Sequence, residues 1–231
     1  MNVTMIHGQS HHGSSYHLAH KLVKQFPEAI IHEFFLTQAL PVFCCGCYRC
    51  MDKDITSCPH ESYMRPIVAS MLESELLIFT TPTYCLHASG AMKSFLDHLF
   101  TWFMVHQPRT ENFSKQALII TTAAGTGMKR AAKDIKDSLA FWGISDIQIL
   151  AIRTMSASWE QMSIASKQKA FHKLKLSAKH IRNRLGQGHV SIKTKLIFHV
   201  MRLMQKRNKG VPEDKQYWEA MGWLAANRPW K

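Results

Sequence analysis

The sequence predicts an α/β protein built on a parallel sheet, and two observations carry this prediction. Five short apolar segments have the length and composition of buried strands, and segments with a helical apolar pattern alternate with them. Three strands are followed by loops of small or hydroxyl-bearing residues, near 8–16, 81–89 and 122–127. In a parallel sheet such loops gather at the carboxyl edge, where ligands bind.

The expected strands cover residues 2–7, 29–36, 76–79, 117–121 and 146–152. The expected helices follow the first loop to about residue 26 and cover 61–73, 91–105, 128–141 and 159–185. Ser14 or Ser15 is a candidate N-cap of the first helix, but a glycine and hydroxyl loop entering a helix also suits a phosphate group. Gly143 fits the C-cap region of the helix over 128–141.

Composition places the chain among ordered globular proteins. It has 231 residues, of which 46% are apolar and 19% charged, enough for one sizeable core and an appendage. No apolar run approaches the roughly 18–20 residues that span a bilayer. The first residues lack the basic and apolar regions of a signal peptide. We therefore expect a cytoplasmic protein.

The positive charge is concentrated in the last part of the chain. Residues 1–164 contain 13 Lys+Arg and 13 Asp+Glu, whereas residues 165–231 contain 16 and 3. We expect residues 186–231 to form a basic helical extension, with helices over 192–206 and 217–225, beside a main domain over 1–185. A dimer arm explains its aromatic and Met residues, and a membrane-surface helix explains its basic amphipathic pattern. Nucleic-acid binding explains only the charge, and no motif supports it.

Five of the six cysteines fall within residues 44–58, too close together for a disulfide framework. Four have the spacing Cys44-x2-Cys47-x2-Cys50-x7-Cys58, which resembles a compact run of iron–sulfur ligands. A tetrahedral zinc site is a second interpretation. A third is that these thiols hold no metal and serve as packing or redox groups.

Four segments together resemble the flavodoxin-like NAD(P)H-dependent oxidoreductases, which include the FMN reductases and the iron–sulfur flavoproteins. They are the loop Gly8–Tyr16, the turn Pro82-Thr83-Tyr84, the segment Ser89-Gly90-Ala91-Met92-Lys93-Ser94-Phe95-Leu96-Asp97 and the run Cys44–Cys50. The resemblance covers about residues 1–155. It implies a flavodoxin-like five-stranded parallel sheet of order 2-1-3-4-5, with helices on both faces and FMN between strands one and three.

The resemblance assigns the flavin contacts to the three loops. They are Ser10, His12, Ser14, Ser15, Tyr16, Pro82, Thr83, Tyr84, Cys85, Thr122, Ala123, Ala124 and Gly125. The chain departs from the family at residues 11 and 12, where histidines stand in place of a frequent Arg or Lys. Tyr84 would stack on or shield the flavin, or else plug the sheet edge. In iron–sulfur flavoproteins a run like Cys44, Cys47, Cys50 and Cys58 holds a [4Fe–4S] cluster beside FMN.

The implied function is an FMN-dependent oxidoreductase. NAD(P)H would reduce the flavin, which would pass electrons to a quinone, nitro-compound, free flavin or similar acceptor. No acid–base residue is then obligatory, because the flavin supplies the redox chemistry. The alternative is an iron–sulfur flavoprotein that carries single electrons between proteins, and a third hypothesis is a scaffold without cofactor. The family further implies a homodimer, and the basic extension suggests weak contact with a membrane surface.

Overall fold

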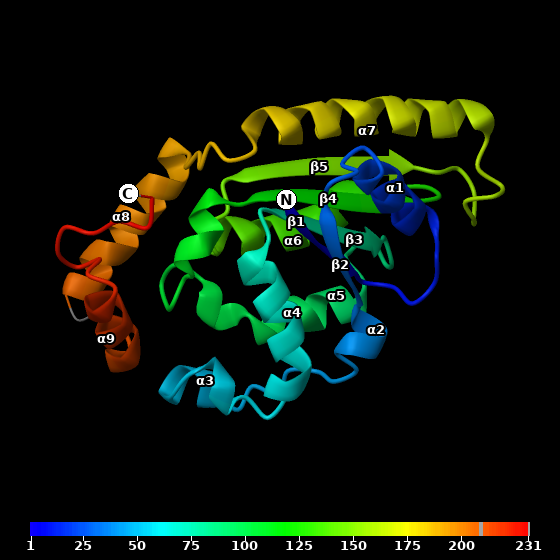
Figure 1. Cartoon of the computed structure of the whole chain (residues 1–231). Helices are drawn as coiled ribbons and strands as arrows, with labels where there is room; N and C mark the ends of the chain where they lie inside the picture. The colour runs from blue at the N-terminus through cyan, green and yellow to red at the C-terminus, as the bar shows by residue number, and fades with distance from the viewer. Residues whose placement is uncertain (208–209, 231) are drawn as a thin grey trace.

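The computed structural model describes residues 1–207 and 210–230 and contains a parallel sheet of five strands (Figure 1). The strands are β1 (Asn2–His7), β2 (Ile30–Phe35), β3 (Leu76–Pro82), β4 (Gln116–Ala123) and β5 (Asp146–Arg153). Their order is β2-β1-β3-β4-β5, which confirms the predicted sheet. Since β1 pairs with both β2 and β3, the order of the strands reverses there.

Helices cover both faces of this sheet. They are α1 (Ser14–Val23), α2 (Leu36–Ala39), α3 (Arg49–Asp52), α4 (Glu61–Glu73), α5 (Gly90–His98), α6 (Met128–Phe141), α7 (Ile164–Arg184), α8 (Ile192–Lys206) and α9 (Pro212–Ala220). Helices α1 and α7 pack on one face, and α4, α5 and α6 pack on the other. Figure 1 shows α7 lying along the sheet and α8 and α9 together at one end of the molecule.

The three central strands, β1, β3 and β4, are buried on both sides because helices cover both faces of the sheet there. Along β3, Leu76 and Ile78 belong to the core beneath α1 and α7, while Leu77 and Phe79 belong to the core beneath α4, α5 and α6. Continuous apolar runs are typical of parallel sheets buried in this way. This explains why the sequence shows short unbroken apolar segments in place of an alternating pattern.

Four helices differ from the sequence prediction in their bounds. The first, expected to about residue 26, ends at Val23. The helix expected over 91–105 ends at His98, because residues 100–102 form a 3-10 turn that buries Trp102. The helix expected from residue 159 begins at Ile164, where the Ser163 hydroxyl accepts a bond from the Ser166 N–H. The last helix covers Pro212–Ala220, and Gly222 in a left-handed conformation lies beyond its end.

The C-terminal helices pack on the chain's own main domain. Phe198, Trp218 and Trp223 are buried against Met104 and Phe113. The aromatic residues that suggested an arm on a second subunit are therefore used within one chain. In the described part of the chain, none of the helices has the length and apolar character that crossing a bilayer requires.

The C-terminal helices lie at the amino-terminal edge of the sheet. Ser145, directly before β5, donates a hydrogen bond through its Oγ to the carbonyl of His189 at 2.9 Å. Its Oγ also accepts a bond of 3.2 Å from the N–H of Ser191, the N-cap of α8. The basic extension is thus anchored at the edge opposite to the loops that follow the strands.

Lys115 is a buried cation that fixes the start of β4 against the end of α4. Its Nζ donates hydrogen bonds of 2.7 Å to the carbonyls of Leu72 and Ser74. Burial lowers the pKa of Lys115 from 10.5 to about 8. Between these two values the unfolded chain holds a proton that the folded protein has released, so stability rises with pH across this window.

Replacing Lys115 by Met should remove this rise in stability between about pH 8 and pH 10.5. The free energy of unfolding of the wild type, taken relative to that of the variant, should increase with pH. The slope of this increase should be at most about 1.4 kcal/mol per pH unit. Urea unfolding at several pH values measures both proteins. Lys93→Met, at an exposed lysine paired with Asp97, is the control and should keep the wild-type slope. An unchanged slope in Lys115→Met would contradict the assignment.

Candidate functional site

The loops that follow β1, β3 and β4 meet at the carboxyl edge of the sheet and line a cleft of about 370 Å³. The structure brings nine of the thirteen predicted flavin contacts to this cleft. These are His12, Ser14, Ser15, Pro82, Thr83, Tyr84, Thr122, Ala123 and Ala124. The cleft lies at the switch point of the sheet, where β1 has β2 on one side and β3 on the other.

Helix α1 enters the cleft without a side-chain cap. Its N-cap is Gly13, and neither Ser14 nor Ser15 takes this place, so the capping prediction was wrong. A Cβ at Gly13 would come within 2.8 Å of the His11 imidazole, so the backbone approaches this ring closely. The first N–H groups of α1 therefore remain available, and the positive end of the helix dipole adds to their attraction for an anion such as phosphate.

The loop after β3 has an uncommon conformation. Cys85 and Leu86 have φ values of 50° and 71°, and a left-handed conformation costs roughly 1–2 kcal/mol for residues other than glycine. Tyr84 and His87 exchange backbone hydrogen bonds of 3.1 and 2.9 Å across this turn. Asp134 of α6 holds it in place, since its Oδ2 lies 3.1 Å from Nδ1 of His87. The rest of the fold thus maintains the strained turn beside the cleft.

Ser89 joins the loops that follow β1 and β3. Its Oγ donates a bond of 2.5 Å to the carbonyl of Gly8 and accepts one from the N–H of Met92 at the start of α5. The Ser89 N–H donates to Thr81 Oγ1 at 3.0 Å. A single serine therefore caps α5 and fixes the separation of the two loops.

The cleft contains a polar group that no protein atom satisfies. Thr83 Oγ1 is buried and has no hydrogen-bond partner among the described residues. An unsatisfied buried hydroxyl costs roughly 1–3 kcal/mol, which a ligand with polar ring atoms would recover. The uncapped α1 gives the cleft one end suited to a phosphate, and Thr83, with its unsatisfied hydroxyl, belongs to the wall at the end of β3. The residues present fit FMN.

Four predicted flavin contacts do not line the cleft. Ser10, Cys85 and Gly125 are exposed in the loops outside its lining. The Tyr16 ring stacks on the ring of His12 at 4.0 Å and so packs along α1. Sequence position alone placed these residues on the right loops but could not give the direction of their side chains.

A fourth loop of the cleft, which follows β5, was not predicted from the sequence. Its lining residues are Thr154, Ser156, Ala157, Ser158, Trp159 and Glu160. The signal was present, because small and hydroxyl-bearing residues follow this strand as they follow the other three. Trp159 stacks on His17, and burial lowers the pKa of that histidine. None of the described lining residues is Lys or Arg, so an anion here would depend on N–H groups and hydroxyls.

The cysteines of residues 44–58 line a second cavity, of about 230 Å³. Within the described residues, no three of their sulfur atoms lie within 4.8 Å of one another. A single tetrahedral zinc with bonds of about 2.3 Å would hold its sulfurs about 3.8 Å apart, so this arrangement does not match zinc. Burial raises the pKa of Cys50 to about 11. The backbone N–H of Arg49 lowers the pKa of the exposed Cys47.

The cysteine cavity lies at the far end of α5 from the cleft. Asp97 and His98 line it, whereas Ser89 at the cleft loops begins the same helix of nine residues, which is about 13 Å long. Within one chain, α5 thus lies between the cysteine cavity and the loop that Ser89 joins to the cleft. His98 has both ring nitrogens engaged, by the Ser94 carbonyl and by His60.

Comparison with known proteins agrees with this architecture. The model of the NADPH-dependent FMN reductase family matches residues 1–156. The fold resembles an NADH:FMN oxidoreductase in apo form, with 17% identity, a TM-score of 0.58 and coverage of 80% of this chain and 90% of that one. It also resembles an FMN-dependent NADH-azoreductase from Bacillus anthracis in complex with FMN, with 13% identity, a TM-score of 0.61 and coverage of 78% and 99%. No curated protein sequence matched the chain.

The sheet order and the structural likeness define a flavodoxin-like fold. The family match covers more than half of the 231 residues, so the chain belongs to the NADPH-dependent FMN reductase family. It is therefore an NAD(P)H-dependent flavin oxidoreductase, as the resemblance implied, with FMN as its flavin.

Gly127 is a position where the cleft loops tolerate only glycine. Its φ is +95°, and an added Cβ would come within 2.8 Å of Leu86 Cα and of Thr83 Cγ2. Gly127→Ala should lower the free energy of unfolding by about 1–3 kcal/mol, from backbone strain and from displacement of the neighbouring loop. Urea denaturation without added flavin measures this loss.

The matched control is Gly125→Ala, two residues earlier in the same loop. Gly125 has no positive φ, and an added Cβ there would meet nothing within 4 Å. Its stability should stay within about 0.5 kcal/mol of the wild type. If both variants lost the same free energy of unfolding, the close packing at Gly127 would not be what stabilises the cleft loops.

Proposed function

We propose that the cleft binds FMN through its loops and that the protein passes electrons from NAD(P)H to a quinone, nitro-compound, free flavin or similar small acceptor. One observation carries the proposal: an uncapped helix N-terminus and Thr83, whose buried hydroxyl has no partner among the described residues, line the same cleft at the switch point of the sheet. When bound, the flavin supplies the hydride and electron chemistry.

The residues of the cleft have separate roles in this proposal. The N–H groups and hydroxyls of Ser14 and Ser15 would bind the phosphate, with His12 beside them and Ser10 at the start of the loop. Pro82, Thr83 and Tyr84 would lie along the flavin ring. A further set would border its polar edge: Thr122, Ala123, Ala124 and Gly125. Cys85 and Tyr16 would support these loops from outside the lining.

The surroundings of the cleft favour a flat apolar acceptor. Tyr84, Leu86 and Met155 are exposed on the loops around the cleft. Apolar side chains beside a polar cleft bind aromatic rings through surface burial, while a few polar groups fix their orientation. This supports a quinone or nitroaromatic acceptor more directly than a small polar one.

We also propose a homodimer, because the same exposed apolar residues beside the cleft would be covered by a second copy. The division into domains 1–185 and 186–231 is supported by a third apolar cluster, apart from the two sheet cores, through which the C-terminal helices pack on Met104 and Phe113. The cysteines gathered in one segment support a reducing, cytoplasmic location.

On α8, an exposed stripe that includes Ile192 and Leu196 lies beside Lys193, which supports weak contact with an anionic membrane surface.

The direct test is titration of the purified protein with FMN, followed by oxidation of NADH and NADPH with each acceptor class. Flavin fluorescence and the visible spectrum report binding. The expected result is one FMN per chain and nicotinamide oxidation that requires this flavin. A protein that refuses FMN would overturn the proposed function.

Thr83→Val tests the unpartnered hydroxyl. Because no described protein atom satisfies Thr83 Oγ1, this variant should leave the flavin-free protein equally stable or more stable. The FMN dissociation constant should rise about fivefold, which corresponds to one hydrogen bond of about 1 kcal/mol. As the control, Thr121→Val removes a hydroxyl that donates to the Met128 carbonyl at 3.1 Å, so it should lower stability. Loss of stability in Thr83→Val without weaker FMN binding would contradict the assigned role.

An iron–sulfur flavoprotein is the second candidate, favoured by the single cavity that Cys44, Cys47, Cys50 and Cys58 line. Under this hypothesis, protein purified without air contains about four irons per chain and shows broad absorbance besides the flavin bands. Cys50→Ser should lose the iron, and Cys45→Ser should keep it, since Cys45 lies outside the four-cysteine spacing. Yellow protein without iron would leave the cysteines as packing or redox thiols.

A further inference from the structure

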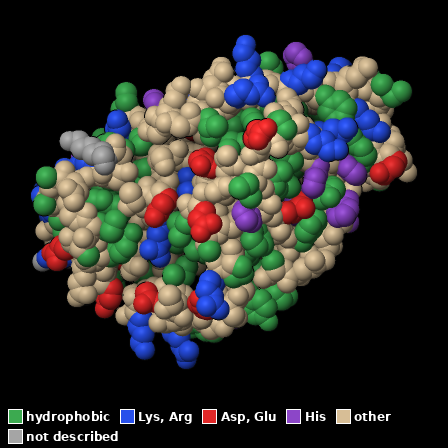
Figure 2. All heavy atoms as spheres, in the orientation of Figure 1, with side chains coloured by type: hydrophobic (Ala, Val, Ile, Leu, Met, Phe, Trp, Pro, Cys, Tyr) green, Lys and Arg blue, Asp and Glu red, His purple; other side chains and the backbone are tan. Residues whose placement is uncertain are grey.

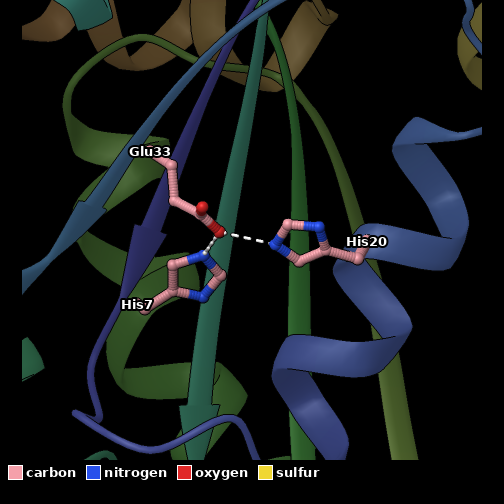
Figure 3. A group of neighbouring side chains, drawn as sticks. All are labelled: His7, His20 and Glu33. Atoms are coloured by element: carbon pink, nitrogen blue, oxygen red, sulfur yellow. Dashed lines mark hydrogen bonds and ion pairs between the residues drawn. The ribbon is translucent and has the colours of Figure 1, made fainter.

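Histidine side chains group on one face of the molecule around α1 and β2 (Figure 2). Three ligand-bearing side chains from separate elements meet within this region: His7 at the end of β1, His20 on α1 and Glu33 in β2 (Figure 3). Nε2 of His7 and Nε2 of His20 each lie 2.7 Å from the same oxygen, Oε1 of Glu33. All three ligand atoms lie within 4.8 Å of one another.

The flavin cleft does not use this group, because none of the three residues lines it. Two imidazoles and one carboxylate are a common donor set for zinc and other first-row transition metals, in sites that keep open positions for water. In the described part of the chain, no other His, Cys, Asp or Glu side chains bring three ligand atoms so close together.

A contact behind His7 supports a ligand role for its Nε2. Nδ1 of His7 lies 2.7 Å from Oγ1 of Thr80, which is buried in β3. Without an ion, the contact of Nε2 with Glu33 needs a proton on Nε2, so Nδ1 then accepts from the Thr80 hydroxyl. When an ion binds Nε2, the ring proton stands on Nδ1 and the Thr80 hydroxyl accepts it. Metal-ligating histidines usually have such a partner on the other ring nitrogen. Ion binding would thus replace the N–H contacts with Glu33.

The group is accessible from one side only. The His7 side chain is fully buried, whereas the side chains of His20 and Glu33 are 32% and 28% exposed. The rings of Tyr16 and Phe35 lie 5.5 and 4.7 Å from the His7 ring and form the apolar wall of the group. An ion can therefore enter from solvent, and water can complete its coordination.

We propose that His7, His20 and Glu33 form a binding site for a divalent transition-metal ion of the zinc class, separate from the flavin cleft and from the cysteine cavity. The ion joins β1, α1 and β2 through one ligand from each. It serves as a clamp that holds α1 on the edge of the sheet.

Titration of metal-stripped protein with Co²⁺ tests the site, because cobalt reports its ligands through visible absorption. The expected result is one Co²⁺ per chain with visible bands but without intense thiolate-to-cobalt absorption in the near ultraviolet, which excludes the cysteines as its ligands. Zn²⁺ should displace the cobalt and raise the melting temperature. These readouts do not depend on FMN, so they remain valid if the proposed function fails.

Ligand variants separate this site from general binding by surface histidines. His20→Gln and Glu33→Gln should each weaken Co²⁺ binding at this site at least 100-fold, and both residues are exposed enough for the fold to persist. Thr80→Val, behind the ligand, should weaken it about 10- to 100-fold. His32→Gln is the matched control, since His32 is exposed on β2 next to Glu33 and belongs to no such group.

Three outcomes would overturn the proposal. The first is wild-type protein that takes up no Co²⁺ or Zn²⁺ with this spectrum. The second is unchanged affinity in His20→Gln and Glu33→Gln, which would make the group a hydrogen-bonded cluster. The third is an equal loss in His32→Gln, which would show diffuse binding to surface histidines.

Discussion

The hydrogen bond from Ser89 Oγ to the Gly8 carbonyl joins two loops that lead to opposite faces of the sheet. Strand β1 continues into α1 on one face, and β3 continues into α5 on the other. A crevice opens between neighbouring strands whose connections diverge in this way. An added Cβ at Gly8 would meet Ser89 Oγ at 2.5 Å, so only glycine allows this approach. The width of the cleft, and the placement of each loop around it, depend on this contact.

Local pattern was sufficient for those elements in which one apolar pattern holds from the first residue to the last. The predicted bounds of α4, α6 and α8 match the structure, and so do those of β1. The pattern misled where packing changes along a segment. The apolar residues beyond His98 continue a helical period, but burial of Trp102 requires a 3-10 turn there. Sequence periodicity reports which residues are apolar, not which surface covers them.

The candidate site, too, has some features that are local in the sequence and others that depend on the three-dimensional structure. The three loops were identified from small and hydroxyl-bearing residues after apolar strands, and these features are local. The choice of Gly13 as N-cap depends on the position of the His11 ring, which is set in three dimensions. The place of the cysteine cavity depends on the length and direction of α5, since Ser89 at its start joins the cleft loops and Asp97 and His98 at its end line the cavity. Spacing along the chain contains neither of these facts.

Helix α1 connects the cleft with the histidine and glutamate group. Its first turn presents the N–H groups of Ser14 and Ser15, and His20 follows Ser14 by six residues, or about 9 Å along the axis. A hydrogen-bonded helix of this length moves as a rigid unit, so a contact that fixes one end also fixes the other. The bond from His20 to Glu33 ties α1 to β2 and thereby holds its N-terminus at the carboxyl edge. Any group bound between His7, His20 and Glu33 therefore acts on the same helix that the cleft uses to attract an anion.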